Sequence, residues 1–255
     1  MLSTIYKYFI FSFLLLCSTN SVIGQNSFWQ SQRSAVNVNN AFFKKEEQLQ
    51  KEFAAKGLQY PASNVFLRSF KYNSQLEVWV KNTKDEKYKL FKTYRVCMQS
   101  GTMGPKRLQG DYQVPEGFYY INEFNPRSNY HLSLGINYPN ASDRILSDPI
   151  RPGNDIYIHG NCVSVGCVSV NDDDIEEIYI LTGNARAAGQ EFIPVHIFPI
   201  RYDDKKSVEY LENAFRSSAA LQKFSLQLKK VYDEFEKTHE LPIIMIDQKG
   251  DYVVN

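Results

Sequence analysis

Hydrophobic residues recur at helical spacing near the start of the chain, at Phe42, Leu49 and Phe53. This spacing predicts a leading helix, for which we expect Asn39 or Asn40 as the cap and Gly57 as the stop. A polar stretch rich in Asn and Gln precedes the helix. We therefore interpret 25–60 as a helical segment that leads into the main domain.

The middle of the chain is rich in aromatic and β-branched residues, which favour strands. The segments of this kind are 65–70, 76–80, 88–98, 118–121, 156–158 and 192–200. In the second segment, Leu76, Val78 and Val80 occupy every other position, which is the period of a strand. Clusters of Gly, Pro and Asn predict long loops, and we place 140–142 in one of them. We expect 61–201 to form a mainly β domain within an α+β chain.

One helix is expected inside this β region. The run 172–174 is entirely Asp, and acidic side chains stabilise the first turn of a helix. Ile175, Ile178 and Tyr179 then provide an apolar face. This helix begins shortly after Cys167, so it lies next to the segment with candidate chemistry.

Beyond Arg201 the chain becomes charged and helical in pattern. Apolar residues repeat at helical spacing at Leu221, Phe224, Leu228, Val231, Tyr232 and Phe235. Such a stripe is typical of a helix that packs on a core, and we favour this interpretation over cofactor binding. The segments 242–247 and 251–254 predict a hairpin around Lys249-Gly250. We treat 202–255 as a C-terminal helical extension.

The segment 1–24 has the features of a secretory signal peptide. Lys7 supplies its only charge, 8–17 form an apolar run, and 22–24 offer compact residues for cleavage. The run is shorter than the ~20 apolar residues of a membrane-spanning helix. We therefore expect 1–24 to be removed and the protein to be periplasmic. Lipoprotein anchoring at Cys17 is the less favoured alternative, because a bulky leucine precedes it.

The charge balance gives no support to nucleic-acid binding. The formal net charge is +1, and loss of Lys7 with the signal lowers it by one. No segment forms a long basic block, which contact with many phosphates requires. Nucleic acid is therefore not an expected partner.

The cysteine count points to a free thiol. After removal of the signal the chain carries Cys97, Cys162 and Cys167, an odd number. An oxidising compartment pairs cysteines, so at least one thiol stays free or pairs with another chain. A buried, inert cysteine is the alternative interpretation.

The segment 156–168 combines residue types that suit thiol catalysis. A hydrophobic strand leads to His159, and a turn with Gly and Ser leads to Gly166-Cys167. A thiolate nucleophile needs an imidazole that takes its proton or stabilises the ion pair. The N–H groups of Gly166 and Cys167 are expected to face the developing oxyanion. Two alternatives remain: a core histidine with buried cysteines, or zinc bound by His159, Cys162 and Cys167 without an evident fourth ligand.

Short motifs follow one another in a characteristic order between about 65 and 200. They are Gly104-Pro105-Lys106, Gly110-Asp111, 115–119, 130–134, 138–140, 143–144, His159-Gly160, Ser164 and Gly166-Cys167. This set resembles the L,D-transpeptidase catalytic domain of the YkuD type. It is most similar to the YafK-like murein branch, in which His-Gly and Gly-Cys lie only a few residues apart. The resemblance implies mixed sheets in a sandwich-like or barrel-like arrangement.

The resemblance also assigns roles to matching positions. Cys167 takes the position of the nucleophile and His159 that of the base. The carbonyl of Gly160 takes the position that orients the imidazole, while Ser164 and Gly166 shape the turn at the oxyanion site. No cofactor and no metal are implied.

The reaction that the resemblance implies begins on a peptidoglycan stem peptide. Cys167 would attack the carbonyl of its third residue, a diamino acid, and form a thioester. An amine from a neighbouring stem would resolve the thioester by transpeptidation, and water by hydrolysis; related enzymes release peptidoglycan-linked protein. Val165 stands where many members carry a second histidine, a departure that bears on the acyl acceptor. A catalytically silent wall-binding module is the alternative from another class, against which the retention of both His159 and Cys167 argues.

Arg144, Tyr130 and His131 are the candidates for substrate contact. As a hypothesis, Arg144 binds a carboxylate of the stem peptide. The alternative is an ion pair of Arg144 with Asp143 or Asp148. For His131, an orienting or packing role is the alternative.

A disulfide between Cys97 and Cys162 would leave Cys167 reduced. This hypothesis follows from the oxidising compartment and the odd count, since connectivity is not encoded in cysteine spacing.

Overall fold

A mixed sheet forms the centre of the protein. The computed structural model describes residues 27–83 and 86–254, so the expected signal 1–24 lies outside the described residues. The strands are β1 (Asn64–Phe70), β2 (Gln75–Lys81), β3 (Lys89–Arg95), β4 (Gly117–Asn125), β5 (Ser133–Ile136), β6 (Tyr157–His159), β7 (Val168–Ser169) and β8 (Ile193–Phe198). Their order in the eight-stranded sheet is β3-β2-β1-β8-β4-β5-β6-β7. The pairs β1–β8 and β6–β7 are parallel, and the other pairs are antiparallel.

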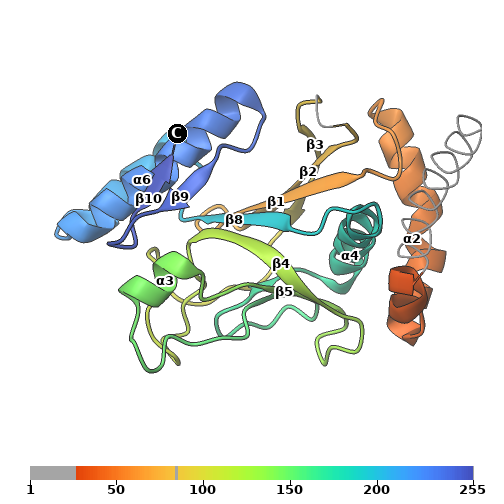
Figure 1. Cartoon of the computed structure of the whole chain (residues 1–255), viewed down its shortest axis with the longest axis horizontal. Coiled ribbons are helices and arrows are strands. Elements are labelled where there is room, and N and C mark those ends of the chain that lie inside the picture. Colours follow the sequence, from red (N-terminus) through yellow and green to blue (C-terminus); the bar gives the residue numbers. More distant parts are fainter. Residues whose placement is uncertain (1–26, 84–85, 255) are drawn as a thin grey trace, which may run out of the picture.

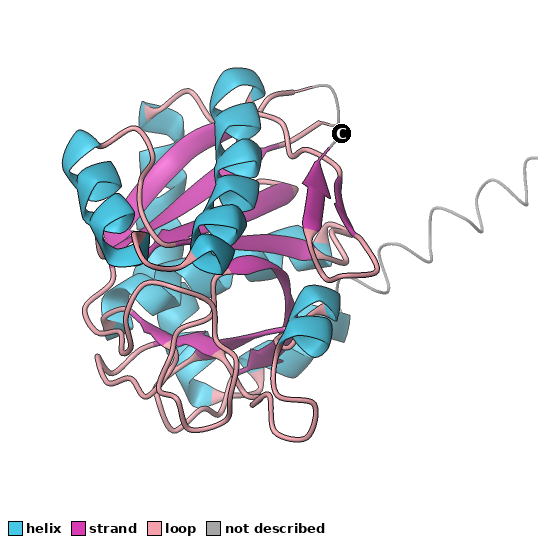
Figure 2. Cartoon of the chain, turned by 90° about the vertical axis from the view of Figure 1, so that its left-hand side faces the viewer, coloured by secondary structure: helices cyan, strands magenta, loops and turns pink. Residues whose placement is uncertain are grey.

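Helices lie against the sheet from two sides (Figure 1). They are α2 (Val36–Ala55), α3 (Ala141–Leu146), α4 (Asp172–Ala187), α5 (Lys205–Phe215) and α6 (Ala219–Thr238). Helix α4 packs on the sheet and α2 packs on α4. Helix α6 lies at the other end together with a hairpin of β9 (Ile244–Ile246) and β10 (Tyr252–Val254). Figure 2 shows helices in front of the strands on this second side. The expected α+β class, the α4 and α6 helices and the hairpin are thus confirmed.

The central strand β1 is buried on both faces. Val65 and Leu67 belong to the large core that also contains α4. Phe66 and Phe70 point to the other side, where they pack with residues of α6. The apolar stripe of α6 therefore covers the sheet, as its spacing predicted.

A buried ion cluster fastens α6 to the sheet. Arg68 is 1% exposed, and its guanidinium contacts Glu77 on β2 at 2.7 Å and Glu236 on α6 at 2.6 Å. The Nε1 of Trp79 also donates to Glu77 at 2.8 Å. Both faces of β2 are therefore buried. Glu77 is stable inside the protein because charged partners satisfy its carboxylate.

Two local expectations were wrong at helix starts. Helix α2 begins at Val36 after Ala35, which makes no side-chain cap, so neither Asn39 nor Asn40 is its cap. Residues 140–142, expected in a loop, begin α3: the Asn140 side chain accepts from Asp143 N, and Asp143 accepts from Asn140 N. This reciprocal capping box stabilises a helix start that composition alone does not distinguish from a turn.

The stop of α2 was predicted correctly. Gly57 has φ +63°, a conformation that suits glycine. Its N–H donates to Ala54 O, and the next N–H, of Leu58, donates to Phe53 O. These two bonds satisfy carbonyls that a helix end otherwise leaves without partners.

Candidate active site

The parallel pair β6–β7 brings the segments of the two main candidate residues together, because His159 ends β6 and Cys167 directly precedes β7. Ile158 lies opposite Val168, and His159 lies opposite Ser169. The backbone N–H of Tyr157 on β6 acts on the thiol of Cys167, so the sulfur lies beside the strand that carries His159. The turn 160–167 joins the strands and brings the nucleophile candidate back to the strand that carries the base candidate.

The hydrogen bonds of His159 define its tautomer. Its side chain is buried, and Nδ1 lies 2.7 Å from the carbonyl oxygen of Gly160. A carbonyl only accepts, so Nδ1 carries the proton and Nε2 keeps its lone pair. Burial lowers the pKa of His159 below its ordinary value, opposed by the bond to Gly160. The imidazole is therefore a neutral base at neutral pH.

The thiol of Cys167 is half-buried and is the free one among the cysteines of the described residues. Burial raises its pKa, and the negative charge of Asp155 acts in the same direction. The backbone N–H of Tyr157 and the positive charge of Lys106 lower the pKa and oppose this effect. The sulfur lies 3.9 Å from Asp155 O, and within the described residues no hydrogen bond joins it to His159. Thiol and imidazole are thus both neutral at neutral pH.

The turn before the nucleophile is closed by Ser164. Its Oγ accepts from the N–H of Gly166 at 3.2 Å and from the N–H of Cys167 at 3.1 Å. It also donates to Cys167 O at 2.7 Å. The two N–H groups that we expected to face an oxyanion therefore face a serine hydroxyl, and a substrate oxygen must displace Ser164 Oγ to reach them.

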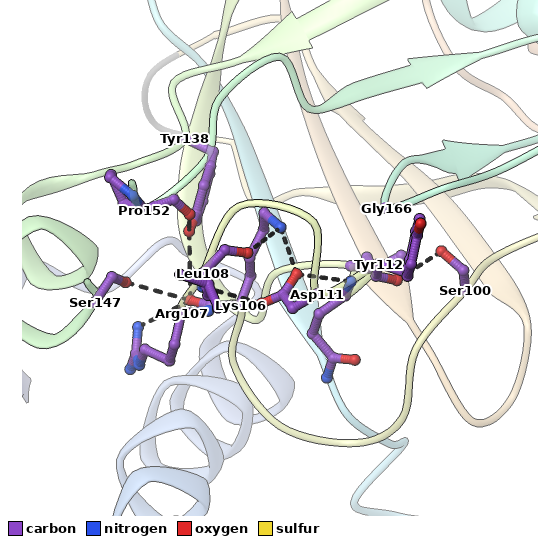
Figure 3. Close-up of polar contacts among 12 residues, drawn as sticks. Ser100, Lys106, Arg107, Leu108, Asp111, Tyr112, Tyr138, Ser147, Pro152 and Gly166 are labelled. Atoms are coloured by element: carbon purple, nitrogen blue, oxygen red, sulfur yellow. Dashed lines mark hydrogen bonds and ion pairs between the residues drawn. The ribbon is translucent and has the colours of Figure 1, made fainter. Parts of the chain in front are cut away.

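The loop that contains Lys106 lies beside this turn (Figure 3). Lys106 is buried and donates to Leu108 O and to Asp111. A Cβ atom on Gly166, which has φ +130°, would lie 3.5 Å from Gln113 O. Lys106 and Gln113 are neighbours of the site that sequence reasoning missed; the motif around Lys106 was visible, but its proximity to Cys167 depends on the fold.

The disulfide joins Cys97 to Cys162, as hypothesised. Near it, Cys97 N donates to Ser169 O at 2.9 Å, so the segment after β3 is held against β7. The sulfur of Cys162 is consumed by this bond and is not available as a thiolate ligand. The zinc interpretation with His159, Cys162 and Cys167 is therefore wrong.

The aromatic ring of Tyr130 covers the imidazole of His159. The two ring centroids are 4.6 Å apart at an interplanar angle of 30°. Tyr130 O also accepts from Gly160 N at 3.2 Å. Tyr130 is 42% exposed, so its ring contacts the buried imidazole of His159 while remaining partly accessible to solvent.

His131 and Arg144 lie in other contacts. Nε2 of His131 is 2.9 Å from Glu176 on α4, which fits the orienting or packing role. Arg144 Nε donates to Pro139 O at 3.2 Å. The ion pair considered for Arg144 is made by Arg107, whose Nη1 lies 2.9 Å from Asp143.

A free thiol beside the strand that ends in a neutral imidazole is the combination of groups that thiol nucleophiles use. Residues 73–197 match the family YkuD, described as L,D-transpeptidase catalytic domain. The Escherichia coli (strain K12) protein named "Putative L,D-transpeptidase YafK" is 36% identical over 199 residues, which cover 77% of this chain and 76% of that protein. The chain belongs to the L,D-transpeptidase family.

Two solved structures are similar at lower identity. The helical cell shape determining protein Pgp2 from Campylobacter jejuni has 17% identity and a TM-score of 0.44, over 72% of this chain and 73% of that chain. Bd1075 from Bdellovibrio bacteriovorus has 19% identity and a TM-score of 0.38, over 74% and 79% of the two chains.

Proposed function

We propose that the protein is an exported cysteine acyl-transfer enzyme that acts on peptidoglycan stem peptides. The observation that carries this proposal is the free thiol of Cys167 beside β6, the strand that carries the neutral imidazole of His159, in a chain of the L,D-transpeptidase family. Neither group needs a cofactor for acyl transfer.

The reaction proceeds in two halves. Nε2 of His159 takes the thiol proton while the sulfur of Cys167 bonds to the carbonyl carbon of the third stem residue. The amide bond beyond that carbonyl breaks, and the imidazolium returns the proton to the leaving amine. The resulting thioester is then attacked by an amine, which gives a crosslink, or by water, which gives a shortened stem or a released protein. In either case the thiol proton is restored through His159.

Export is part of the proposal. The features of 1–24 support it, and so does the Cys97–Cys162 disulfide, because such bonds persist in oxidising compartments. Of the helices described in 27–83 and 86–254, none is long and apolar enough to cross a membrane.

The test is incubation of the mature protein with purified peptidoglycan fragments, followed by mass spectrometry of protein and products. Cys167→Ala is the matched control. A thioester adduct on the wild type alone, with crosslinked products, supports transpeptidation. The adduct with only shortened stems or released protein assigns hydrolysis. No adduct, with identical products from both proteins, contradicts the proposal and leaves a wall-binding module.

A further inference from the structure

A cavity of about 620 Å³ lies where the C-terminal extension meets the loop 101–113. One wall comes from this loop, and another from the end of α3. The remaining walls are the start of α6 and the β9–β10 turn, both in the extension. The residues that matter for the argument are Arg107, Gln113, Leu146, Lys223, Phe224 and Lys249. We call this cavity the C-terminal pocket.

The C-terminal pocket shares the loop 101–113 with the catalytic turn. The side chain of Gln113 lines the pocket, where its Nε2 donates to Thr102 O and Gly104 O. The main chain of Gln113 faces the other way, because its carbonyl oxygen lies 3.5 Å from the position of a Cβ on Gly166. The pocket and the nucleophile turn therefore lie on opposite sides of one loop.

The charges around the pocket are mainly positive. Arg107, Lys223 and Lys249 line it, against the single carboxylate of Asp251. Asp251 pairs with Lys223, and the pair of Arg107 is the buried Asp143. Lys249 forms no direct ion pair among the described residues, although its positive charge also acts on Asp251 and lowers the pKa of that carboxyl. A carboxylate ligand would gain favourable contacts here.

The rest of the pocket is apolar. Leu146 of α3 and Phe224 of α6 form part of its wall, with Met103 and Leu221 beside them. Leu146 is 42% exposed although it is a large aliphatic side chain. A ligand that carries carboxylates and short apolar groups side by side matches this combination of cations and apolar surface.

We propose that the C-terminal pocket binds a carboxylate-bearing part of the stem peptide that lies outside the acylated residue. Carboxylates of the peptide contact Lys249 and Lys223, and its alanine methyl groups contact Leu146 and Phe224. This inference rests on the proposed function for the identity of the peptide. It gives the C-terminal extension a role in substrate binding, and it places the carboxylate contact at these lysines, since Arg144 does not line the pocket.

Binding is measured by calorimetry with the Cys167→Ala protein and a purified stem peptide, so that the test does not depend on turnover. Lys249→Glu is introduced into that protein. The matched control is Lys229→Glu, a charge reversal on α6 outside the pocket, where Lys229 pairs with Asp233. We expect about tenfold weaker binding for Lys249→Glu and no change for Lys229→Glu, with an effect that decreases at high salt.

A second arm uses the same peptide with its carboxylates converted to carboxamides. It is expected to bind weakly to both variants, with no difference between them. Equal affinities of Lys249→Glu and Lys229→Glu for the unmodified peptide overturn the inference. Peptide binding that depends on Lys249, combined with no adduct on the wild-type protein in the mass-spectrometry test, supports the pocket and contradicts the proposed catalysis. The two failures are therefore distinguishable.

Discussion

The Oγ atom of Ser169 lies 3.3 Å from Nε2 of His159 while its hydroxyl donates to the carbonyl of Val163. Because the hydroxyl proton is used by Val163, a lone pair of Ser169 Oγ faces the imidazole. This lone pair accepts a hydrogen bond once Nε2 has taken the thiol proton. In the proposed reaction, Ser169 would therefore act as a positioning residue that stabilises the imidazolium.

Replacement Ser169→Ala removes that acceptor. We expect Cys167 to be alkylated about tenfold more slowly at neutral pH, because hydrogen bonds to charged groups contribute about 1.5–3 kcal/mol. The rate is measured with a small uncharged thiol reagent. Ser142→Ala is the control. The buried hydroxyl of Ser142, which lies on α3, also donates to a carbonyl, that of Gly250. Equal rates for the wild type and Ser169→Ala would show that the contact has no such role.

The pH dependence of the reaction follows from the two shifted groups. The pKa of His159 lies below the ordinary histidine value of about 6.5. The imidazole therefore stays unprotonated, and able to act as a base, while the pH falls to about 6.5. The raised pKa of Cys167 keeps the thiol protonated at neutral pH. We therefore expect kcat/KM for the stem peptide to decrease only below about pH 6.5. A decrease of kcat/KM toward acid pH whose midpoint lies above about pH 7 would contradict a neutral base. The variant His159→Gln should lose the activity measured in this pH profile.

The candidate pair His159 and Cys167 could be proposed from the sequence, but the contacts around it could not. His159 and Cys167 lie in one short segment, so their types and order carry the information. Ser169 lies two residues beyond Cys167. Its contact with His159 depends on the parallel pairing of β6 and β7, which sequence spacing alone does not specify. The contact of Ser164 Oγ with the N–H groups of the turn depends on a side-chain conformation that composition does not specify.

Elements with long, regular patterns were predicted better than helix starts. Of the six apolar positions in the stripe of α6, all but Leu221 pack with residues of the sheet, which confirms the prediction, while Leu221 packs beside α5. The start of α2 was missed because Val38, fully buried, extends the packed helix beyond the expected caps. Packing thus outweighed a local preference that contributes about 1 kcal/mol.

Gly160 has little room for a side chain. A Cβ atom there would lie 2.5 Å from Asp172 Oδ1 and 3.0 Å from Tyr130 O. We expect Gly160→Ala to displace the carbonyl that orients His159 and so to slow the alkylation of Cys167. We also expect it to lower the free energy of unfolding by about 1–3 kcal/mol. Thermal unfolding and alkylation are measured together. The control is Gly189→Ala, where a Cβ would meet no atom within 4 Å although φ is +102°. If both variants lose stability equally and both keep the wild-type alkylation rate, the contact with His159 is not controlled by Gly160.

The disulfide closes a long segment that includes much of the site. Cys97 and Cys162 are separated by 65 positions, and a cross-link over such a loop restricts the unfolded chain. We expect the double replacement Cys97→Ala, Cys162→Ala to lower the free energy of unfolding by about 2–4 kcal/mol. Urea unfolding is measured in a Cys167→Ala background, which prevents thiol exchange. In the same background, reductant should destabilise the cross-linked protein by a similar amount and leave the double variant unchanged.

His196 is expected to make the protein sensitive to acid. It is 4% exposed, among the rings of Phe66, Phe118 and Phe198. Burial lowers its pKa to about 3, and the positive charge of Arg68 acts in the same direction. The unfolded chain binds a proton near pH 6.5 and the folded protein does not, so stability is fully present above 6.5 and decreases as the pH falls toward 3.

The expected slope from His196 is at most about 1.4 kcal/mol for each pH unit between 6.5 and 3. Replacement His196→Leu removes this titration. As the pH falls, the wild type should therefore lose more unfolding free energy than the variant. The comparison at pH 8, where His196 is neutral in both states, gives the packing cost of the substitution alone. The measurement is urea unfolding at several pH values. A wild-type minus variant difference that is the same at pH 8 and pH 5 would mean that His196 is not held neutral by the fold.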